Sequence, residues 1–293
     1  KAFYGSFKGI KKSYLLDNYF KDTIGLVVRL GVTLDENFLC RFTNLKFIAS
    51  ITTGLDHIDR EYCLTKKISI ISLKGEYNFL KKIRSTPEHN WLLILAISRK
   101  ILAASNDVLE GNWNRKNYFG HELFKKNLGI LGYGRVGKII SKYAIAFGMK
   151  VFVNDIKKID SHNVHSVSVD KLFKISDYLS INLPLNKSTH HFVDYNKMSK
   201  MKRESYLINT SRGAILNQED LIKILSQKII SGAAIDVIED ENHSKFDITK
   251  TNIYNYASKN NNLIITPHIA GSSYESMQTT ADFISKKIIE FLQ

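Results

Sequence analysis

The sequence predicts an α/β protein in which two doubly wound parallel sheets form separate domains. The first observation is a series of short apolar segments that alternate with polar connections over residues 22–83. The second is a longer series of strand-like and helix-like segments over residues 128–292. The third is a glycine-rich turn at the start of that second series. Repeated βα units of this kind pack as parallel sheets with helices on their faces.

The N-terminal part contains three predicted buried strands, at residues 24–29, 46–50 and 68–72. Each is a short, largely apolar run bounded by polar residues. Residues 1–21 are aromatic and basic with little periodicity, so they are left unassigned. The chain begins at Lys1 rather than at Met, and we expect residues to precede it.

A helix is predicted to begin at Thr86 and to run towards Ala104. Thr86 would be its N-cap, Pro87 its first residue and Glu88 part of its first turn, and these positions favour these residue types. The helix is apolar on several faces. We therefore expect it to be buried in a domain or in a dimer interface.

The second series continues the alternation of strands and helices. Strands are predicted at residues 128–131, 150–154, 178–182, 205–210, 233–237 and 263–266, and helices at residues 138–147, 217–227 and 274–292. In open parallel sheets, ligands bind at the carboxyl ends of the strands. Four residues able to carry chemistry come just after predicted strands: Arg212, Asp236, Glu241 and His268.

The glycine-rich turn has the pattern Gly-x-Gly-x-x-Gly of a dinucleotide-binding fingerprint. Gly132 permits the tight turn, Gly134 lets the backbone approach a pyrophosphate, and Gly137 lets helix and strand pack closely. The free N–H groups at the start of the following helix then face the phosphates. Asp155 ends the next strand, about 20 residues on, where an acid binds ribose hydroxyls and disfavours a 2′-phosphate. The sequence therefore predicts a Rossmann-like domain that binds NAD.

Composition and charge exclude several other classes of protein. The net charge is +14, but lysine is spread along the chain and no basic block has interleaved aromatic residues, so we predict no nucleic-acid partner. No apolar run approaches the ~20 residues of a membrane span, and no secretory signal is visible. Cys40 and Cys63 have neither disulfide nor metal-ligand spacing. We expect a cytoplasmic protein without a metal site or a membrane partner.

Three segments beyond the fingerprint point to a particular kind of enzyme: Asn209–Gly213 (NTSRG), Ala234–Glu241 (AIDVIEDE) and Thr266–Gly271 (TPHIAG). Thr53–Asp59 and Glu110–Trp113 fit the same pattern. In this order and spacing, the chain from about residue 22 to its end resembles the D-isomer-specific 2-hydroxyacid dehydrogenase family, which includes phosphoglycerate dehydrogenases.

The resemblance implies roles for the residues that follow the strands. Arg212 is expected to clamp the substrate carboxylate and polarise the carbonyl, because a guanidinium suits that bidentate contact. His268 is expected to be the acid/base, since histidine titrates near working pH. Glu241 is expected to orient the imidazole, although Glu239 and Asp240 adjoin it and the family usually has proline where Asn242 stands.

The resemblance also implies the residues that contact the ligands. The expected cofactor contacts are Thr86, Gly132, Tyr133, Gly134, Arg135, Val136, Gly137, Asp155, Leu183, Pro184, Thr189, Thr210, Ser211, Asp236, His268 and Gly271. Asp236 is expected to bind the nicotinamide carboxamide. The expected substrate contacts are Thr53, Gly54, Arg29 and Arg212, where Arg29 is equally well explained as a surface residue. His57 and His89 are interpreted as structural.

We therefore predict two Rossmann-like doubly wound domains with an active-site cleft between them. Residues 1–83 and 272–293 would form a discontinuous substrate domain, and residues 84–271 the NAD-binding domain. The predicted reaction interconverts a 2-keto acid and a D-(R)-2-hydroxy acid, in a homodimer. An NADH-sensing scaffold or corepressor-like protein is the alternative, since fold alone does not decide function. A non-carboxylic substrate such as formate or phosphite is a second one.

Overall fold

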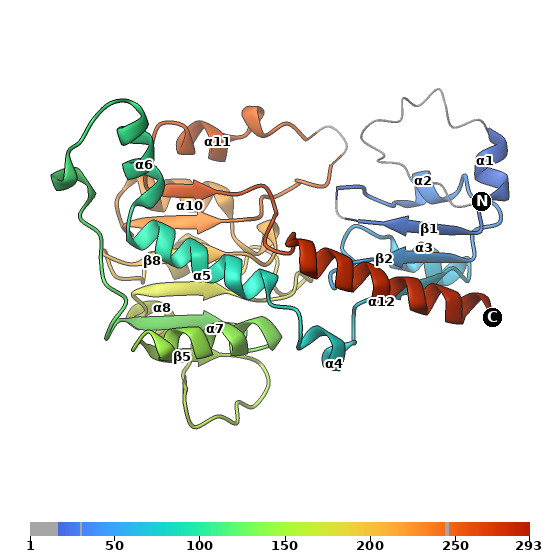
Figure 1. Ribbon diagram of the computed structural model, residues 1–293, viewed down its shortest axis with the longest axis horizontal. Helices are drawn as coiled ribbons and strands as arrows, with labels where there is room; N and C mark the ends of the chain where they lie inside the picture. Colours follow the sequence, from blue (N-terminus) through green and yellow to red (C-terminus); the bar gives the residue numbers. More distant parts are fainter. Residues whose placement is uncertain (1–16, 30, 244–245) are drawn as a thin grey trace. The chain divides into compact units, whose positions relative to one another are not determined.

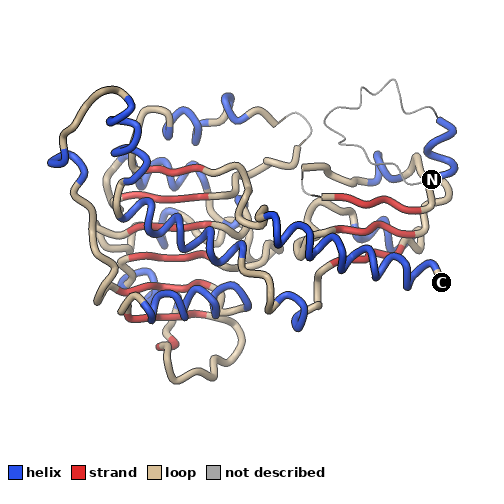
Figure 2. Tube along the Cα trace, viewed as in Figure 1, coloured by secondary structure: helices blue, strands red, loops and turns tan. Residues whose placement is uncertain are grey.

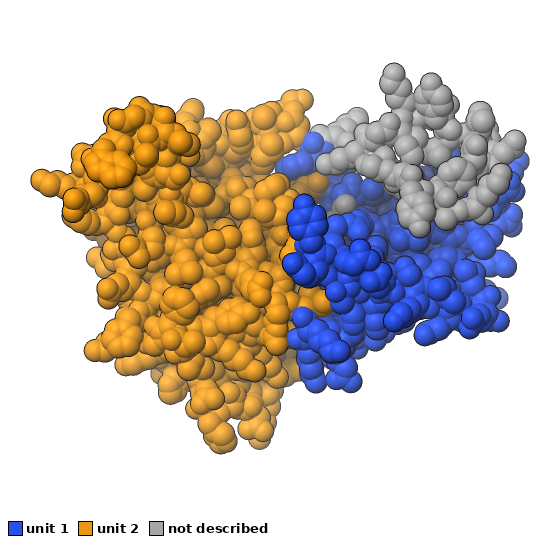
Figure 3. Space-filling view, viewed as in Figure 1, with its two compact units in different colours: residues 1–82, 242–246, 274–293 blue, residues 83–241, 247–273 orange. Residues whose placement is uncertain are grey.

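The computed structural model describes residues 17–29, 31–243 and 246–293. The chain forms two compact units, coloured separately in Figure 3. Unit 1 holds the described residues of 1–82, 242–246 and 274–293, and unit 2 holds residues 83–241 and 247–273. Each unit contains one parallel sheet, shown by the red strands in Figure 2. The predicted α/β fold with two parallel sheets is confirmed, whereas the functions assigned to the two units stay predictions.

The sheet of unit 2 has seven strands in the order β10-β9-β8-β7-β4-β5-β6, and every neighbouring pair is parallel. The strands are β4 (Asn127–Leu131), β5 (Lys150–Asn154), β6 (His165–Ser166), β7 (Tyr178–Ile181), β8 (Tyr206–Asn209), β9 (Gly232–Ile235) and β10 (Leu263–Ile265). The strand order reverses between β4 and β7. In open α/β sheets this switch point opens a crevice at the carboxyl ends of the strands.

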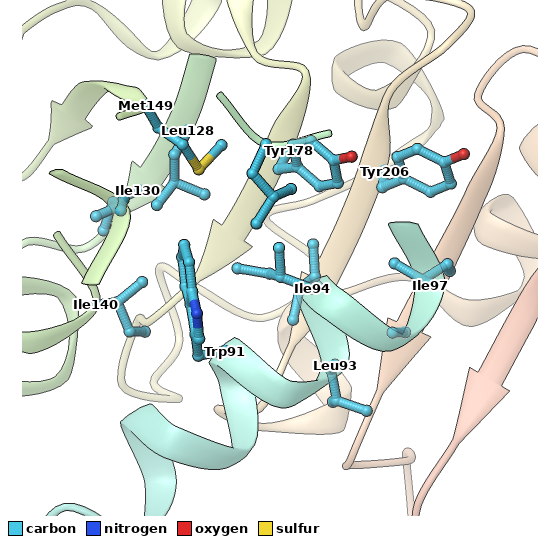
Figure 4. Close-up of a cluster of buried hydrophobic side chains, with 14 of the residues drawn as sticks. Trp91, Leu93, Ile94, Ile97, Leu128, Ile130, Ile140, Met149, Tyr178 and Tyr206 are labelled. Atoms are coloured by element: carbon cyan, nitrogen blue, oxygen red, sulfur yellow. The ribbon is translucent and has the colours of Figure 1, made fainter. Parts of the chain in front are cut away.

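The core of unit 2 lies where helix α5 (Ser85–Ser98) crosses the sheet (Figure 1). Trp91 and Ile94 of α5 point towards Leu128 and Ile130 of β4, in a cluster shielded from water (Figure 4). The other helices of unit 2 are α6 (Ile101–Leu109), η1 (Arg115–Tyr118), α7 (Arg135–Ala146), α8 (Val169–Ile175), α9 (Tyr195–Met198), η2 (Gly213–Ile215), α10 (Gln218–Ser226), η3 (Ile248–Lys250) and α11 (Asn252–Ala257). This packing fixes the strand ends that carry the candidate site.

Two details of the helix predicted from Thr86 to Ala104 are wrong. The first residue of α5 is Ser85, two residues before Pro87, so Thr86 lies inside the first turn and is not the N-cap. The hydroxyl of Ser85 donates to the carbonyl of Ala270 over 2.7 Å. The helix also ends at Ser98, because Lys100 adopts a left-handed backbone with φ +52° before α6 begins. A residue in that conformation cannot continue a right-handed helix.

Unit 1 is built on the parallel sheet β1-β2-β3, formed by Gly25–Val28, Phe47–Ser50 and Ser69–Ser72. Helix α12 (Tyr274–Leu292) lies along this sheet and contacts β2 and β3 (Figure 1). Phe283 of α12 stacks on Phe79 with ring centroids 3.9 Å apart. The remaining helices are α1 (Asp17–Asp22), α2 (Glu36–Leu39), α3 (Arg60–Thr65) and α4 (Tyr77–Leu80).

Candidate active site

The three glycines between β4 and α7 differ in the space around them. A Cβ on Gly132, whose φ is +94°, would lie 2.6 Å from the carbonyl oxygen of Asn182. A Cβ on Gly137 would lie 2.5 Å from the carbonyl oxygen of Gly132. A Cβ on Gly134 would meet nothing within 4 Å. Gly132 and Gly137 therefore serve close packing, while the open space at Gly134 fits the approach of a cofactor pyrophosphate.

Asp155 directly follows β5, and the glycine-rich turn orients its carboxylate. One oxygen accepts the backbone N–H of Tyr133 over 2.7 Å, and the other accepts that of Lys157 over 2.9 Å. A carboxylate has about four lone-pair sites, so these two bonds leave capacity for ribose hydroxyls. The neighbouring Arg135 donates to the carbonyl of Ile83 over 3.0 Å, and burial, with the charge of Arg84 adding to it, lowers the pKa of Arg135.

His268 and Glu241 form a close pair at the ends of β10 and β9. Nδ1 of His268 lies 2.6 Å from Oε1 of Glu241, and both side chains are largely buried. The second carboxylate oxygen of Glu241 accepts the backbone N–H of Ile238 over 3.3 Å. His268 itself has a left-handed φ of +53°, a conformation that costs energy in a residue with a Cβ and is held by its surroundings.

Asp236 supplies that restraint. Its backbone carbonyl accepts the N–H of His268 over 2.8 Å. Its fully buried carboxylate accepts the N–H groups of Ile269 and Ala270, over 2.9 and 2.7 Å, and the hydroxyl of Thr266 over 2.5 Å. Burial acts to raise the pKa of Asp236, but hydrogen bonds from His89, Thr266 and these two N–H groups outweigh it and lower the pKa below its usual value.

Arg212 lies in a turn that its neighbours fix. The side chain of Asn209 accepts the N–H and hydroxyl of Ser211 and donates to the carbonyl of Arg212 over 2.9 Å. A Cβ on Gly213 would lie 2.2 Å from the carbonyl carbon of Ile238 and 2.4 Å from the nitrogen of Glu239. The segment with Arg212 is thus in backbone contact with the turn that carries Glu241.

The structure separates the adjacent acids that the sequence left ambiguous. Glu241 pairs with His268, whereas Oε1 of Glu239 lies 2.5 Å from Nε2 of His191. Asp240 between them has a left-handed φ of +56°. His191 was not predicted from the sequence, because its pairing with Glu239 joins residues far apart in the chain.

A buried amide network supports Thr210. Asn90 of α5 is fully buried, donates to the hydroxyl of Thr210 over 2.9 Å and accepts the hydroxyl of Ser180 over 3.1 Å. Ser180 also accepts from Asn182 over 3.0 Å. Asn90, which was not predicted from the sequence either, therefore connects α5 to the carboxyl ends of β7 and β8. The interpretation of His89 as structural fits its contacts with Thr266 and Asp236, at 3.1 and 3.4 Å.

All the predicted cofactor contacts belong to unit 2. Leu183, Pro184 and Thr189 lie in one loop after β7, where the hydroxyl of Thr189 donates to the carbonyl of Pro184 over 2.7 Å. Gly271 follows the turn of His268, and a Cβ there would meet nothing within 4 Å. Their contacts with the cofactor stay predictions.

Three of the predicted substrate contacts belong to unit 1. The loop with Thr53 and Gly54 follows β2, and the hydroxyl of Thr52 donates to the carbonyl of Gly54 over 2.7 Å. Arg29 donates to the sulfur of Met277 over 3.7 Å. The roles of Thr53, Gly54 and Arg29 stay predictions.

Within the described part of the chain, no helix is both long and apolar enough to cross a membrane. The same residues hold no group of three or more His, Cys, Asp or Glu side chains placed to bind a metal ion.

Comparison with known proteins places the chain in a family. The model of the NAD binding domain of D-isomer specific 2-hydroxyacid dehydrogenases matches residues 91–270. A glyoxylate reductase from Thermococcus litoralis is 30% identical over 282 residues, which cover 92% of this chain and 81% of the relative. A hydroxypyruvate reductase from Thermotoga maritima is 32% identical over 268 residues, which cover 91% and 84%.

Among solved structures, the D-lactate dehydrogenase from Aquifex aeolicus, complexed with NAD and lactic acid, matches with a TM-score of 0.85. It is 28% identical, and the match covers 96% of this chain and 86% of that one. The chain belongs to the D-isomer specific 2-hydroxyacid dehydrogenase family. It is an NAD-dependent D-2-hydroxyacid dehydrogenase, so the predictions of family, enzyme class and cofactor are confirmed.

Proposed function

We propose that this protein reduces a small 2-keto acid to the D-(R)-2-hydroxy acid and catalyses the reverse reaction. The observation that carries the proposal is the pair of His268 and Glu241, 2.6 Å apart, on the carboxyl side of the sheet that also bears Arg212. NADH supplies the hydride when it is bound. Gly134 and Asp155 would hold it, because the space at Gly134 fits a pyrophosphate and the carboxylate of Asp155 suits ribose hydroxyls.

His268 is the proton donor in this proposal. Since Glu241 engages Nδ1, Nε2 is the nitrogen that would give its proton to the carbonyl oxygen as the oxygen becomes a hydroxyl. The carboxylate of Glu241 fixes the orientation of the ring. In the reverse direction Nε2 takes the proton back from the alcohol.

Arg212 holds the carboxylate of the keto acid and draws charge from the adjacent carbonyl. A guanidinium is suited to this because it offers two parallel N–H donors to the two carboxylate oxygens. The backbone N–H groups of the Thr53–Gly54 loop would add further donors. Arg29 would serve a second anionic group on a larger substrate.

Glyoxylate and hydroxypyruvate are the proposed first substrates, because the relatives named for these two acids match nearly the whole chain. The test follows the loss of NADH absorbance with glyoxylate, hydroxypyruvate and pyruvate. Acetaldehyde is the matched control, since it has an aldehyde but no carboxylate for Arg212. We expect turnover of at least one keto acid and little turnover of acetaldehyde. Hydroxypyruvate or pyruvate should give the D product by chiral chromatography, whereas the glycolate formed from glyoxylate has no stereocentre. Tight NADH binding without turnover would instead favour the NADH-sensing scaffold.

We also propose a homodimer in the cytoplasm. Large apolar side chains of unit 2 are exposed along residues 102–124, among them Leu109, Trp113 and Phe119, at 83, 89 and 70%. Exposed apolar groups of this size mark interaction surfaces. Light scattering that gives the mass of a single chain would contradict the dimer.

A further inference from the structure

Three segments of unit 2 lie side by side next to the candidate catalytic residues. The N–H of His191 donates to the carbonyl of Ala214 over 2.7 Å, and Val193 forms a parallel bridge with Leu216. The segment of Ala214 and Leu216 also includes Gly213, which packs on the other side against the backbone of Ile238 and Glu239. The segment that begins with Arg212 is therefore enclosed between the His191 segment and the turn that carries Glu241.

The side chains of His191 and Glu239 connect the His191 segment directly to the turn that carries Glu241. Nε2 and Oε1 are 2.5 Å apart, and the two side chains are 37% and 28% exposed. His191 keeps a left-handed φ of +50°, which glycine would adopt at less cost. A residue held in this conformation at a functional region suggests that its side chain has a task there.

The position of Glu239 defines that task. Glu239 and Glu241 belong to one turn, and only one of the two carboxylates pairs with the imidazole of His268. By binding Glu239, His191 keeps this carboxylate from competing with Glu241 for His268, and it holds residue 239 of the turn in place. Ile238, the first residue of the turn, is already in contact with Gly213.

We propose that His191 and Glu239 are a positioning pair for the reaction, which keeps the turn of residues 238–241 in the register that presents Glu241 to His268. The inference rests on the proposed function of His268 and Glu241. Neither His191 nor Glu239 exchanges a proton with the substrate.

The test compares Glu239→Gln, His191→Gln and the double variant with the wild type. A partly exposed ion pair is modest in strength, so we expect each single change to lower kcat/KM by about threefold to tenfold. The double variant should be no worse than either single one, because partners in one interaction are not additive. Because the pair acts on the arrangement of Glu241 and His268 and not on the glycine-rich turn, the loss should appear in kcat, while the affinity for NADH is kept.

Two further variants separate positioning from stability. His191→Gly removes the pair but suits the left-handed backbone, so its melting temperature should be kept while kcat/KM falls. Lys202→Gln is the matched control, because it breaks a 2.6 Å ion pair with Asp177 in which the two side chains are 40% and 21% exposed. This pair lies before the amino ends of β7 and β8, whereas the candidate site lies at the carboxyl ends of the strands. We expect it to leave kcat and kcat/KM unchanged.

Additive effects of the two single changes, an unchanged kcat, or a loss in Lys202→Gln as large as in Glu239→Gln would each overturn the inference. Failure of the proposed function has a different signature. If His268→Asn keeps its turnover, the acid/base assignment is wrong. If His268→Asn is inactive while Glu239→Gln behaves as the wild type, only the positioning pair is refuted.

Discussion

Replacing Gly213 with alanine tests whether the Arg212 segment and the Glu241 turn must be in direct backbone contact. The added Cβ would lie 2.2 Å from the carbonyl carbon of Ile238, 2.3 Å from its oxygen and 2.4 Å from the nitrogen of Glu239. All three are backbone atoms, so no side-chain rotation relieves the clash. One segment must move by about 0.8 Å to bring the closest contact from 2.2 to 3.0 Å.

A displacement of this size is large for a catalytic group, since a misplacement of about 1 Å costs on the order of a hundredfold in rate. We expect Gly213→Ala to lower kcat/KM for the best keto acid by about that factor. Overpacking should also lower the free energy of unfolding by about 1–3 kcal/mol. That corresponds to roughly 2–4 °C in melting temperature for each kcal/mol.

The assay measures steady-state kinetics, NADH binding by fluorescence and thermal melting on the same preparation. The affinity for NADH should fall less than kcat/KM, because the glycine-rich turn follows β4, whereas Gly213 follows β8. A variant with wild-type kinetics and melting temperature would refute the contact. A lower melting temperature with unchanged kcat/KM would show that the contact serves stability alone.

Two other changes give contrasting outcomes. Gly134→Ala adds a Cβ into open space, so the melting temperature should be kept while NADH binds at least about tenfold more weakly by fluorescence titration; unchanged affinity would contradict the role of that space. The lowered pKa of Asp236 means that its ionised form stabilises the fold above the unfolded value of 3.8 and that this contribution is lost as pH falls through the folded pKa. Asp236→Asn should therefore melt at lower temperature at neutral pH, by about 1–3 kcal/mol in stability, and lose less stability than the wild type on acidification below about pH 4. If the melting temperatures of the wild type and Asp236→Asn fell equally with pH across that range, this assignment would be contradicted.

The glycine-rich turn and all the described strands except the two-residue β6 were predictable, because their signals are local. The predicted strand at residues 150–154 matches β5, and the closing helix predicted at residues 274–292 matches α12. The short helices α3 and α8 were missed although Asp59 and Ser168 cap them, since a single cap before a short apolar run is a weak signal.

Contacts between distant segments could not be derived from the sequence. The family spacing selected Glu241, but only the folded chain shows that His191 engages Glu239 and leaves Glu241 to His268. The left-handed backbone at Lys100 splits one predicted helix into two, and the residue type does not signal it, because lysine rarely adopts that conformation. The contact of the buried Asn90 amide with Thr210 likewise forms only because α5 packs on the strands of the sheet.

The most direct test of the account compares His268→Asn with the wild type in two measurements: NADH binding and turnover of the best keto acid. Asparagine keeps a polar side chain of similar reach but cannot donate a proton as an acid. We expect the variant still to bind NADH and to lose turnover by at least about a hundredfold. Turnover close to that of the wild type would contradict the assignment of His268 as the proton donor.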